Sequence, residues 1–311
     1  MLINRRKFVQ QVSVAGGAVF ASPLLPAHVD DTKEATLTIL HTNDTHSRLE
    51  PFPADAGRNA GLGGVAARAE LIKQIRNETE QVLLLDAGDI FQGTPYFNVF
   101  KGEPEIKAMT MMGYDACTIG EHDLYAGVEN LALQLQYANF PVLLCNYDFT
   151  NTPMEGKCLA YKIFDKGNIR VGVLGIGIKL EGLIANNLFE KTIYKNPVEC
   201  ANATADLLRR KECDLIICLS HLGDKYDEPS LVSDEILAKE CYDIDLIIGG
   251  HTHRFFNKPK IYTNKRGHTT LVNQVGWAGI ELGRLDYSFS RTRRKRLLRT
   301  ATVVLGKKTS E

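Results

Sequence analysis

Short apolar runs recur along this chain and alternate with segments of helical periodicity, which confines it to the α/β class of folds. Continuous apolar runs of this length are typical of strands buried on both faces of a sheet. The runs are Leu37–Leu40, Val82–Leu85, Ala116–Ile119, Val142–Cys145, Val171–Ile176, Leu215–Leu219 and Leu246–Ile248. No repeat or low-complexity linker divides them, so we expect a single domain with a layered α/β core.

Three of the intervening segments carry apolar side chains at the spacing of one helix face. These segments are residues 65–75, 128–138 and 198–208. Asn196 followed by Pro197 predicts the N-cap and the first turn of the third helix, because an asparagine side chain accepts the free N–H groups of a helix start.

The C-terminal part of the chain follows a different pattern. Leu285, Tyr287 and Phe289 alternate with polar residues, which predicts an antiparallel strand with one solvated face. We expect the basic run at residues 291–299 to be a solvated hairpin. Trp277, the single tryptophan of the chain, is expected to pack in the core or at a rim, with a substrate platform as the alternative.

The first 27 residues have the character of an export signal. Arg5-Arg6 precedes the uncharged and mildly apolar stretch Val9–Leu25, and small residues at Ala21 and Ala27 offer cleavage points. The arginine pair resembles a twin-arginine signal, and a Sec signal with an accidental pair is the alternative. We therefore predict an exported protein, periplasmic or at the cell surface, with its domain at residues 28–305 and a polar tail at 306–311. The stretch is too short and too weakly apolar to predict a membrane span.

Charge and cysteine content narrow the class of protein further. Lys+Arg and Asp+Glu both number 37, and this neutral balance gives no support for a nucleic-acid partner. The seven cysteines form no Cys-x-x-Cys motif, so a zinc ribbon is not expected, and the odd count leaves at least one thiol unpaired.

Carboxylate and imidazole side chains follow five of the predicted strands directly. They are Asp44, His46, Asp89, Glu121, His122, His221, His251 and His253. In α/β sheets, ligands bind just beyond the carboxyl ends of the strands, so these side chains are expected at one edge. Carboxylate oxygen with imidazole nitrogen and no thiolate suits manganese, iron or zinc. A bridging carboxylate between two such ions would allow metal-assisted hydrolysis.

Taken singly, each of these motifs has an ordinary structural explanation. An Asp-x-His after a strand is often a turn, a lone histidine such as His221 is often a hydrogen-bonded core residue, and Gly-Gly-His is often a tight turn. Their occurrence at the same place after five different strands favours a common site instead.

The ordered set of motifs resembles the calcineurin-like metallophosphoesterases, in particular the branch of 5′-nucleotidases and UDP-sugar hydrolases. The set is Asn43-Asp44-x-His46, Gly88-Asp89, Gly120-x-His122-Asp123, Ser220-His221 and Gly250-His251-x-His253. The strings at residues 42–46, 113–116 and 219–223 also look like this branch, and the resemblance covers about residues 36–305.

This resemblance implies an α-β-β-α sandwich and an exported hydrolase of phosphomonoesters or nucleotides that uses two divalent ions, manganese, zinc or iron. It implies that one ion is held by Asp44, His46 and His253, the other by Glu121, His221 and His251, with Asp89 between them. It further implies an attacking hydroxide that bridges the ions and a catalytic His122 that contacts the phosphate. A sulfur-ester hydrolase of the sulfur-oxidation type and a degenerate metal-binding subunit of low activity are the alternatives.

The sequence departs from the family pattern Gly-Asn-His-Glu-x-Asp at two positions. Glu121 stands in place of the neutral asparagine, and Tyr125 stands in place of the aspartate that orients the catalytic histidine. Asp123 is close to His122 in sequence but is not a clear substitute. The resemblance does not extend to the C-terminal domain with which the family's 5′-nucleotidases bind the nucleoside. A separate chain that resembles this domain is therefore a possible partner.

Overall fold

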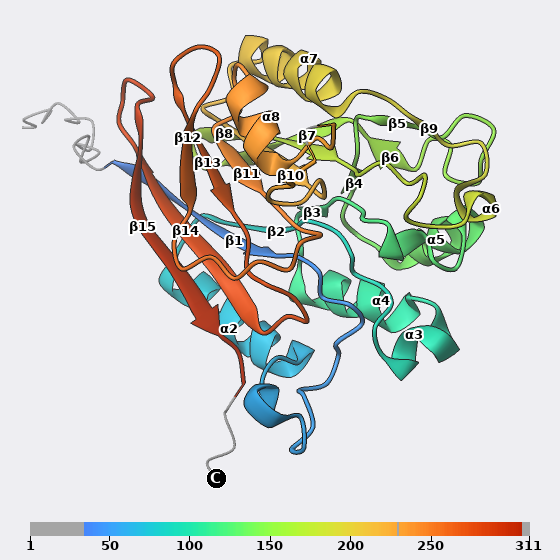
Figure 1. Cartoon of the computed structure of the whole chain (residues 1–311). Helices are drawn as coiled ribbons and strands as arrows, with labels where there is room; N and C mark the ends of the chain where they lie inside the picture. The colour runs from blue at the N-terminus through green and yellow to red at the C-terminus, as the bar shows by residue number, and fades with distance from the viewer. Residues whose placement is uncertain (1–33, 229, 307–311) are drawn as a thin grey trace, which may run out of the picture. The chain divides into compact units, whose positions relative to one another are not determined.

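Two β-sheets stack between two layers of helices in the computed structural model, which describes residues 34–228 and 230–306 (Figure 1). The order of strands in the first sheet is β15-β14-β1-β2-β3-β4-β6, and in the second sheet it is β12-β13-β11-β10-β8-β7. This arrangement confirms the α-β-β-α sandwich. The predicted export signal and residues 307–311 of the predicted tail lie outside the described residues.

The first sheet is parallel from β1 to β6 and antiparallel at β14 and β15. Its strands are β1 (Ala35–Thr42), β2 (Val82–Asp86), β3 (Ala116–Cys117), β4 (Val142–Leu143), β6 (Cys158–Leu159), β14 (Glu281–Phe289) and β15 (Lys295–Val304). The basic run spans the turn between β14 and β15 and the first half of β15, which confirms the predicted hairpin.

The second sheet has a parallel centre with an antiparallel strand at each edge. Its strands are β7 (Tyr161–Lys166), β8 (Ile169–Ile176), β10 (Leu215–Ser220), β11 (Leu246–Ile248), β12 (Lys260–Thr263) and β13 (Thr269–Asn273). A separate ladder joins β5 (Tyr147–Asp148) to β9 (Ile193–Tyr194).

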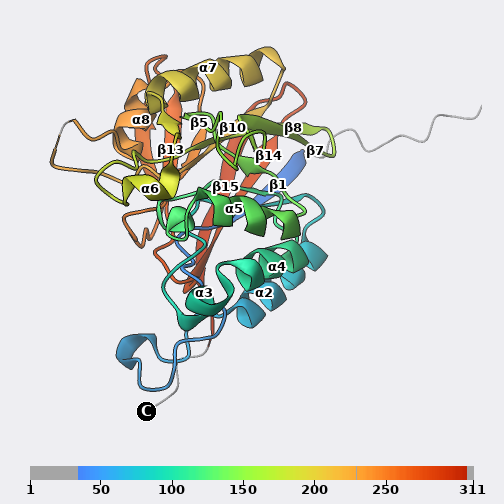
Figure 2. The ribbon, with the colours of Figure 1, turned by 90° about the vertical axis from the view of Figure 1, so that its right-hand side faces the viewer.

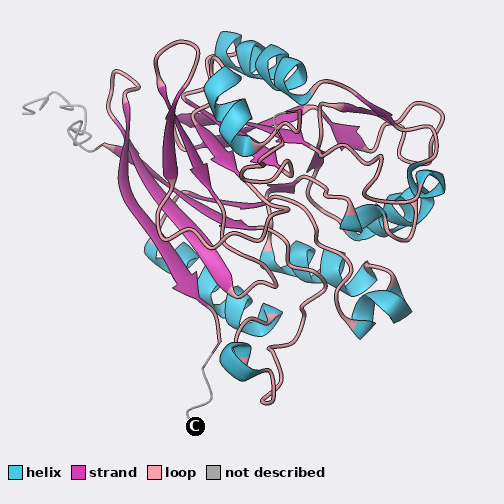
Figure 3. Ribbon diagram, in the orientation of Figure 1, coloured by secondary structure: helices cyan, strands magenta, loops and turns pink. Residues whose placement is uncertain are grey.

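Helices cover the outer face of each sheet (Figures 2 and 3). The first sheet is covered by α2 (Val65–Glu78), α4 (Glu103–Met112) and α5 (Val128–Gln134), and the second by α7 (Pro197–Arg210) and α8 (Asp234–Glu240). The short helices α3 (Pro95–Phe100) and α6 (Asn186–Phe189) and three 3₁₀ turns (Gly57–Asn59, His122–Leu124 and Leu135–Tyr137) complete the fold. The predicted N-cap is confirmed, since Asn196 Oδ1 accepts the N–H groups of Val198 at 3.0 Å and Glu199 at 3.2 Å. Within the described residues, every helix falls short of the length and apolar character needed to cross a bilayer.

Alternation within each strand explains why the predicted runs are continuously apolar. In β2, Leu83 and Leu85 pack between the two sheets, whereas Leu84 faces the helices of the first layer. Successive side chains of a strand point to opposite faces, and here both faces are buried. Ile216 and Ile217 of β10 divide in the same way between the outer helices and the core between the sheets.

Two strands are shorter than their apolar runs predict. The run at 142–145 leaves the first sheet after Leu143, because Leu144 N–H donates to Leu159 but Cys145 N–H donates to Gly175 of the second sheet. The run at 116–119 ends as a strand at Cys117, from where the buried chain turns toward the candidate site.

Candidate metal centre

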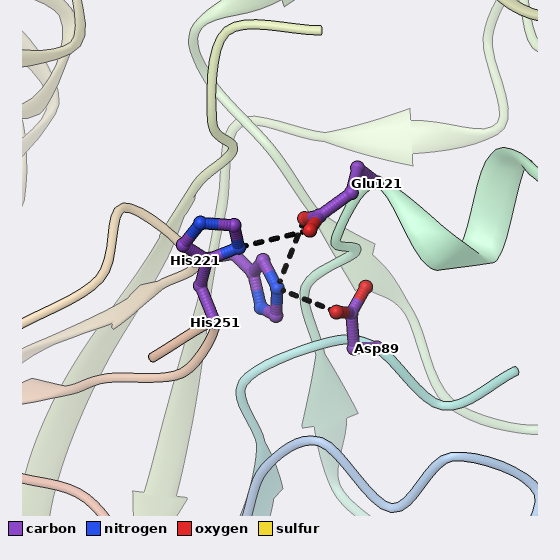
Figure 4. Close-up of side chains that lie close together, drawn as sticks. All are labelled: Asp89, Glu121, His221 and His251. Atoms are coloured by element: carbon purple, nitrogen blue, oxygen red, sulfur yellow. Dashed lines mark ion pairs between the residues drawn. The ribbon is translucent and has the colours of Figure 1, made fainter. Parts of the chain in front are cut away.

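The loops after β1, β2, β3, β10 and β11 bring seven of the eight predicted site residues into two clusters. The first cluster is Asp44, His46 and His253, and the second is Asp89, Glu121, His221 and His251. Within each cluster, the potential ligand atoms all lie within 4.8 Å of one another. Figure 4 shows the side chains of the second cluster pointing toward one another from different loops. Both clusters therefore have the spacing that a metal ion requires.

Asp89 lies between the two clusters. Its Oδ2 is 3.1 Å from His221 Nε2 in the second cluster and 3.9 Å from His46 Nε2 in the first. Because a carboxylate has two oxygens, a residue in this position can contact two ions at once. The geometry makes Asp89 the candidate bridge.

Backbone carbonyls fix the orientation of two of the imidazoles. His221 Nδ1 lies 2.7 Å from the carbonyl of Ala87, and His46 Nδ1 lies 3.1 Å from the carbonyl of Gln92. In the neutral imidazole, an Nδ1–H that donates to a carbonyl leaves the Nε2 lone pair free to bind a metal. The Nε2 atoms of both rings do point into the clusters.

Some polar atoms of the second cluster are buried without a hydrogen bond in the described part of the chain, although they pair with charged neighbours. Nε2 of His221 and Oε2 of Glu121 are buried and make no hydrogen bond within the described residues. In the first cluster, the Nε2 atoms of His46 and His253 are 2.9 Å apart, which in neutral rings allows one hydrogen bond with one ring donating and the other accepting. A divalent ion in each cluster would be coordinated by these nitrogen and oxygen atoms, so the donor set fits a pair of ions.

The backbone at the centre is strained. Asp44, His46, Asp89, His251 and His253 all have positive φ, between 46° and 66°. This left-handed conformation is uncommon for residues other than glycine, and strain of this kind concentrates at functional sites. The fold thus holds five of the seven cluster residues in conformations that the free chain would rarely adopt, which sequence reasoning could not foresee.

Close packing also explains a glycine beside the ligands. A Cβ atom on Gly120 would collide with Asp89 Oδ1 and His221 Nε2. The second cluster can therefore close only because position 120 carries no side chain.

Without metal, the second cluster is an ion-pair network. Burial alone would lower the pKa of His221, but the Asp89 and Glu121 carboxylates raise it well above its usual range. The reverse holds for Glu121, because His221 and His251 outweigh its burial and lower its pKa. The pKa of His253 is also raised, since Asp44 opposes the effect of burial. The neighbouring carboxylates thus favour the protonated forms of His221 and His253 in the metal-free centre, whereas a metal ligand must be deprotonated.

This charge arrangement predicts that metal affinity rises with pH. Each proton displaced from His221 or His253 changes the affinity by up to about tenfold per pH unit while that histidine is protonated in the metal-free protein. The raised pKa of His221 stabilises the metal-free fold fully below the ordinary histidine pKa of about 6.5, and this contribution is lost as the pH rises through the raised value. We expect the difference in Tm between metal-loaded and metal-free protein to widen from about pH 6 to about pH 8. Titration calorimetry in two buffers of different ionisation enthalpy measures the released protons, and affinity independent of pH would contradict the prediction.

Glu121 lies inside the second cluster rather than beside it. Its Oε1 is 2.9 Å from His251 Nδ1, and its Oε2 is 3.4 Å from His221 Nε2. The side chain at this family-divergent position is therefore placed to act as an oxygen ligand.

His122 stands apart from both clusters, at their edge. Its ring is 4.9 Å from that of His46, and its Nε2 is 3.8 Å from Glu121 Oε1. The edge of the Tyr125 ring lies against it, with the centroids 4.4 Å apart. Nδ1 is buried without a hydrogen bond among the described residues, so no carboxylate orients the ring through this atom, and the Tyr125 ring packs against it instead.

Asp123 has a structural role, because it binds backbone N–H groups and not the His122 ring. Its two carboxylate oxygens accept the backbone N–H groups of Asp89, Ile90, Phe91 and Gly120 at 2.8–3.0 Å. These four bonds tie the β2 loop to the β3 loop, so Asp123 builds the centre and does not replace the family's orienting aspartate.

Two further residues support the first cluster. Trp277 stacks on the His253 ring, with centroids 5.7 Å apart and planes inclined by 8°, so it packs at the rim of the centre. Asn43 donates to Asp44 Oδ2 at 2.6 Å and accepts the N–H of Val275 at 2.9 Å. The sequence marks Asn43 through its family-like motif. It contains no pattern that would predict the stacking of Trp277 on His253.

Comparison with known proteins agrees with this geometry. Residues 37–255 match the family model of the calcineurin-like phosphoesterases. The chain is 37% identical over 273 residues to a snake venom 5′-nucleotidase of Gloydius brevicauda, a match that covers 81% of this chain and 45% of the relative. It is 34% identical over 288 residues to the 5′-nucleotidase of Rattus norvegicus, covering 86% of this chain and 48% of the relative.

A solved structure supports the same grouping. The 5′-nucleotidase precursor of Thermus thermophilus superposes with a TM-score of 0.79 at 30% identity, over 88% of this chain and 55% of that one. The chain thus spans about half the length of the relatives it matches. Since the family match extends over most of the described sandwich and includes every residue of the two clusters, the chain belongs to the calcineurin-like phosphoesterase family.

Proposed function

We propose that this chain is a dinuclear metal-dependent phosphoesterase that hydrolyses phosphomonoesters, with nucleotides as the foremost class. The observation that carries this proposal is the pair of ligand clusters with Asp89 between them. The 5′-nucleotidases among its relatives support the choice of substrate class.

The donor sets assign the ligands as follows. Asp44, His46 and His253 would hold one divalent ion, Glu121, His221 and His251 the other, and Asp89 both. Manganese, zinc and iron all suit such oxygen and nitrogen ligands. When bound, the two ions supply water activation and neutralise charge on the phosphoryl group.

The chain's own residues then complete the site. His122 borders both clusters and is not one of the proposed metal ligands. Its imidazole is therefore available to hydrogen-bond a phosphate oxygen or the leaving oxygen. Glu121 adds a negative charge where the family pattern has a neutral amide. Two unit charges about 4 Å apart interact with about 4 kcal/mol at an intermediate dielectric, a repulsion toward phosphate that the ions must offset.

Export and a second chain belong to the same proposal. The Arg5-Arg6 pair and the uncharged stretch after it support export, with the enzyme outside the cytoplasm. A separate chain that resembles the C-terminal domain of the family is the partner that this proposal includes.

The test is metal content together with hydrolysis. We expect purified protein reconstituted with Mn²⁺ to bind two ions per chain by elemental analysis and to hydrolyse AMP and p-nitrophenyl phosphate. His251→Ala removes a ligand and should lose at least one ion and most of the activity. His268→Ala is the matched control, because His268 is exposed in the turn between β12 and β13.

The remaining outcomes decide between the alternatives. Two bound ions without hydrolysis of any phosphate ester would indicate a non-catalytic metal-binding subunit. Hydrolysis of a sulfur ester in preference to phosphate esters would indicate the sulfur-ester hydrolase. A protein that binds no metal would overturn the proposal.

A further inference from the structure

A cavity of about 690 Å³ opens beside the second ligand cluster. It lies between the loop after β8, the start of α7 and the loop after β10, and His251 is part of its wall. Pockets that bind small molecules typically have volumes of about 300–1,000 Å³. His251 Nδ1 is 2.9 Å from Glu121 Oε1, so the cavity reaches the centre itself.

The lining of this cavity is mainly apolar and aromatic. Leu183 and Leu231 enter its wall from two different loops, and 41% and 47% of their surfaces remain exposed. Tyr194 and Tyr226 add two rings to the wall. A single exposed leucine needs no explanation, but two that line one cavity with two tyrosines form a surface suited to an organic ring system.

The inner end of the cavity is held in place. Tyr226 Oη donates to the Leu222 carbonyl at 2.6 Å, and the Tyr226 ring lies 6.4 Å from the His251 ring. A Cβ atom on Gly223 would collide with Tyr226 Oη, so this loop can pack only with glycine there. The aromatic wall is thus built before any substrate arrives, which lowers the cost of binding.

We propose that this cavity binds the organic part of the ester and that it selects ring-bearing leaving groups of nucleoside size. The inference rests on the proposed phosphoesterase function, because the leaving group must lie within bonding distance of a phosphorus held at the ions. It assigns recognition of the organic part of the ester to residues of this chain.

The experiment compares two substrates that share the same 5′-phosphate ester. AMP and ribose 5-phosphate differ in the base, and we expect kcat/KM to be at least about tenfold higher for AMP in the Mn²⁺-loaded protein. Leu183→Ala/Leu231→Ala should lower kcat/KM for AMP about tenfold and leave ribose 5-phosphate within about twofold. Leu298→Ala on β15 is the matched control, since that leucine is 48% exposed and does not line the cavity.

A binding measurement provides a readout that does not depend on turnover. We expect adenosine to bind the isolated chain in calorimetry, and the double variant to weaken its Kd about tenfold, with no change in Leu298→Ala. Equal use of AMP and ribose 5-phosphate, equal losses for both in the double variant, or no binding of adenosine would overturn the inference. Failure to hydrolyse either substrate overturns the proposed function alone, and adenosine binding then still decides whether the cavity is a nucleoside site.

Discussion

Asp89→Ala is expected to release both metal ions and to lower kcat/KM by at least about 10³-fold, which corresponds to about 4 kcal/mol of transition-state stabilisation. The reason is its position: one carboxylate oxygen is 3.1 Å from His221 Nε2 and 3.9 Å from His46 Nε2, so a single change removes a ligand from both ions. The carboxylate also pairs with His221 in the metal-free protein. After its loss, the buried His221 imidazole keeps two carboxylate neighbours, Glu121 at 3.4 Å and Asp44 at 3.9 Å from Nε2.

Elemental analysis and AMP hydrolysis at saturating Mn²⁺ measure this effect. Asp243→Asn is the matched control, because Asp243 is equally a buried carboxylate but precedes β11, at the end of the strand away from the centre, where it pairs with Arg209 and Arg266. We expect the control to keep both ions and its activity within about threefold, as is usual for changes remote from a site. An Asp89→Ala protein that retains one tightly bound ion would show that Asp89 serves only one of the clusters.

The central strands could be predicted because burial on both faces leaves a simple signature. Leu83, Leu84 and Leu85 are all apolar although they face different layers, and such runs identify strands without any knowledge of their neighbours. The division into two sheets could not be predicted, because an apolar run such as Leu215–Leu219 has the same pattern whichever sheet the strand joins. The edge strands β7 and β12 could not be predicted, because their side chains are mostly half-buried or exposed and form no continuous apolar pattern.

The grouping of the candidate ligands could be predicted, and their detailed geometry could be predicted less well. Chain order placed Asp44, Asp89 and His221 after strands, and parallel strands deliver such residues to one edge. The division into two clusters came from the family resemblance. The positive φ of the cluster residues and the stacking of Trp277 on His253 depend on contacts between distant loops, so no local pattern contains them.

His122→Ala is expected to lower kcat for AMP by about 10²–10⁴-fold while both ions stay bound. Its imidazole belongs to neither cluster, so its removal takes away no ligand. It borders the centre at 4.9 Å from the His46 ring, where it can contact the reacting phosphate. Elemental analysis therefore separates this variant from Asp89→Ala, which should lose the ions as well as the activity.

The choice of leaving group shows what His122 contributes. A residue that protonates the leaving oxygen matters most when that oxygen is strongly basic, as in AMP, and least for p-nitrophenolate, which departs without help. If His122 acts in this way, His122→Ala should slow AMP hydrolysis at least about tenfold more than p-nitrophenyl phosphate hydrolysis. Tyr125→Phe is the control, because it retains the ring that packs against His122 at 4.4 Å and should leave both rates nearly unchanged. Equal losses on both substrates would instead assign His122 to the non-bridging oxygens of the phosphate, where its hydrogen bond serves every ester alike.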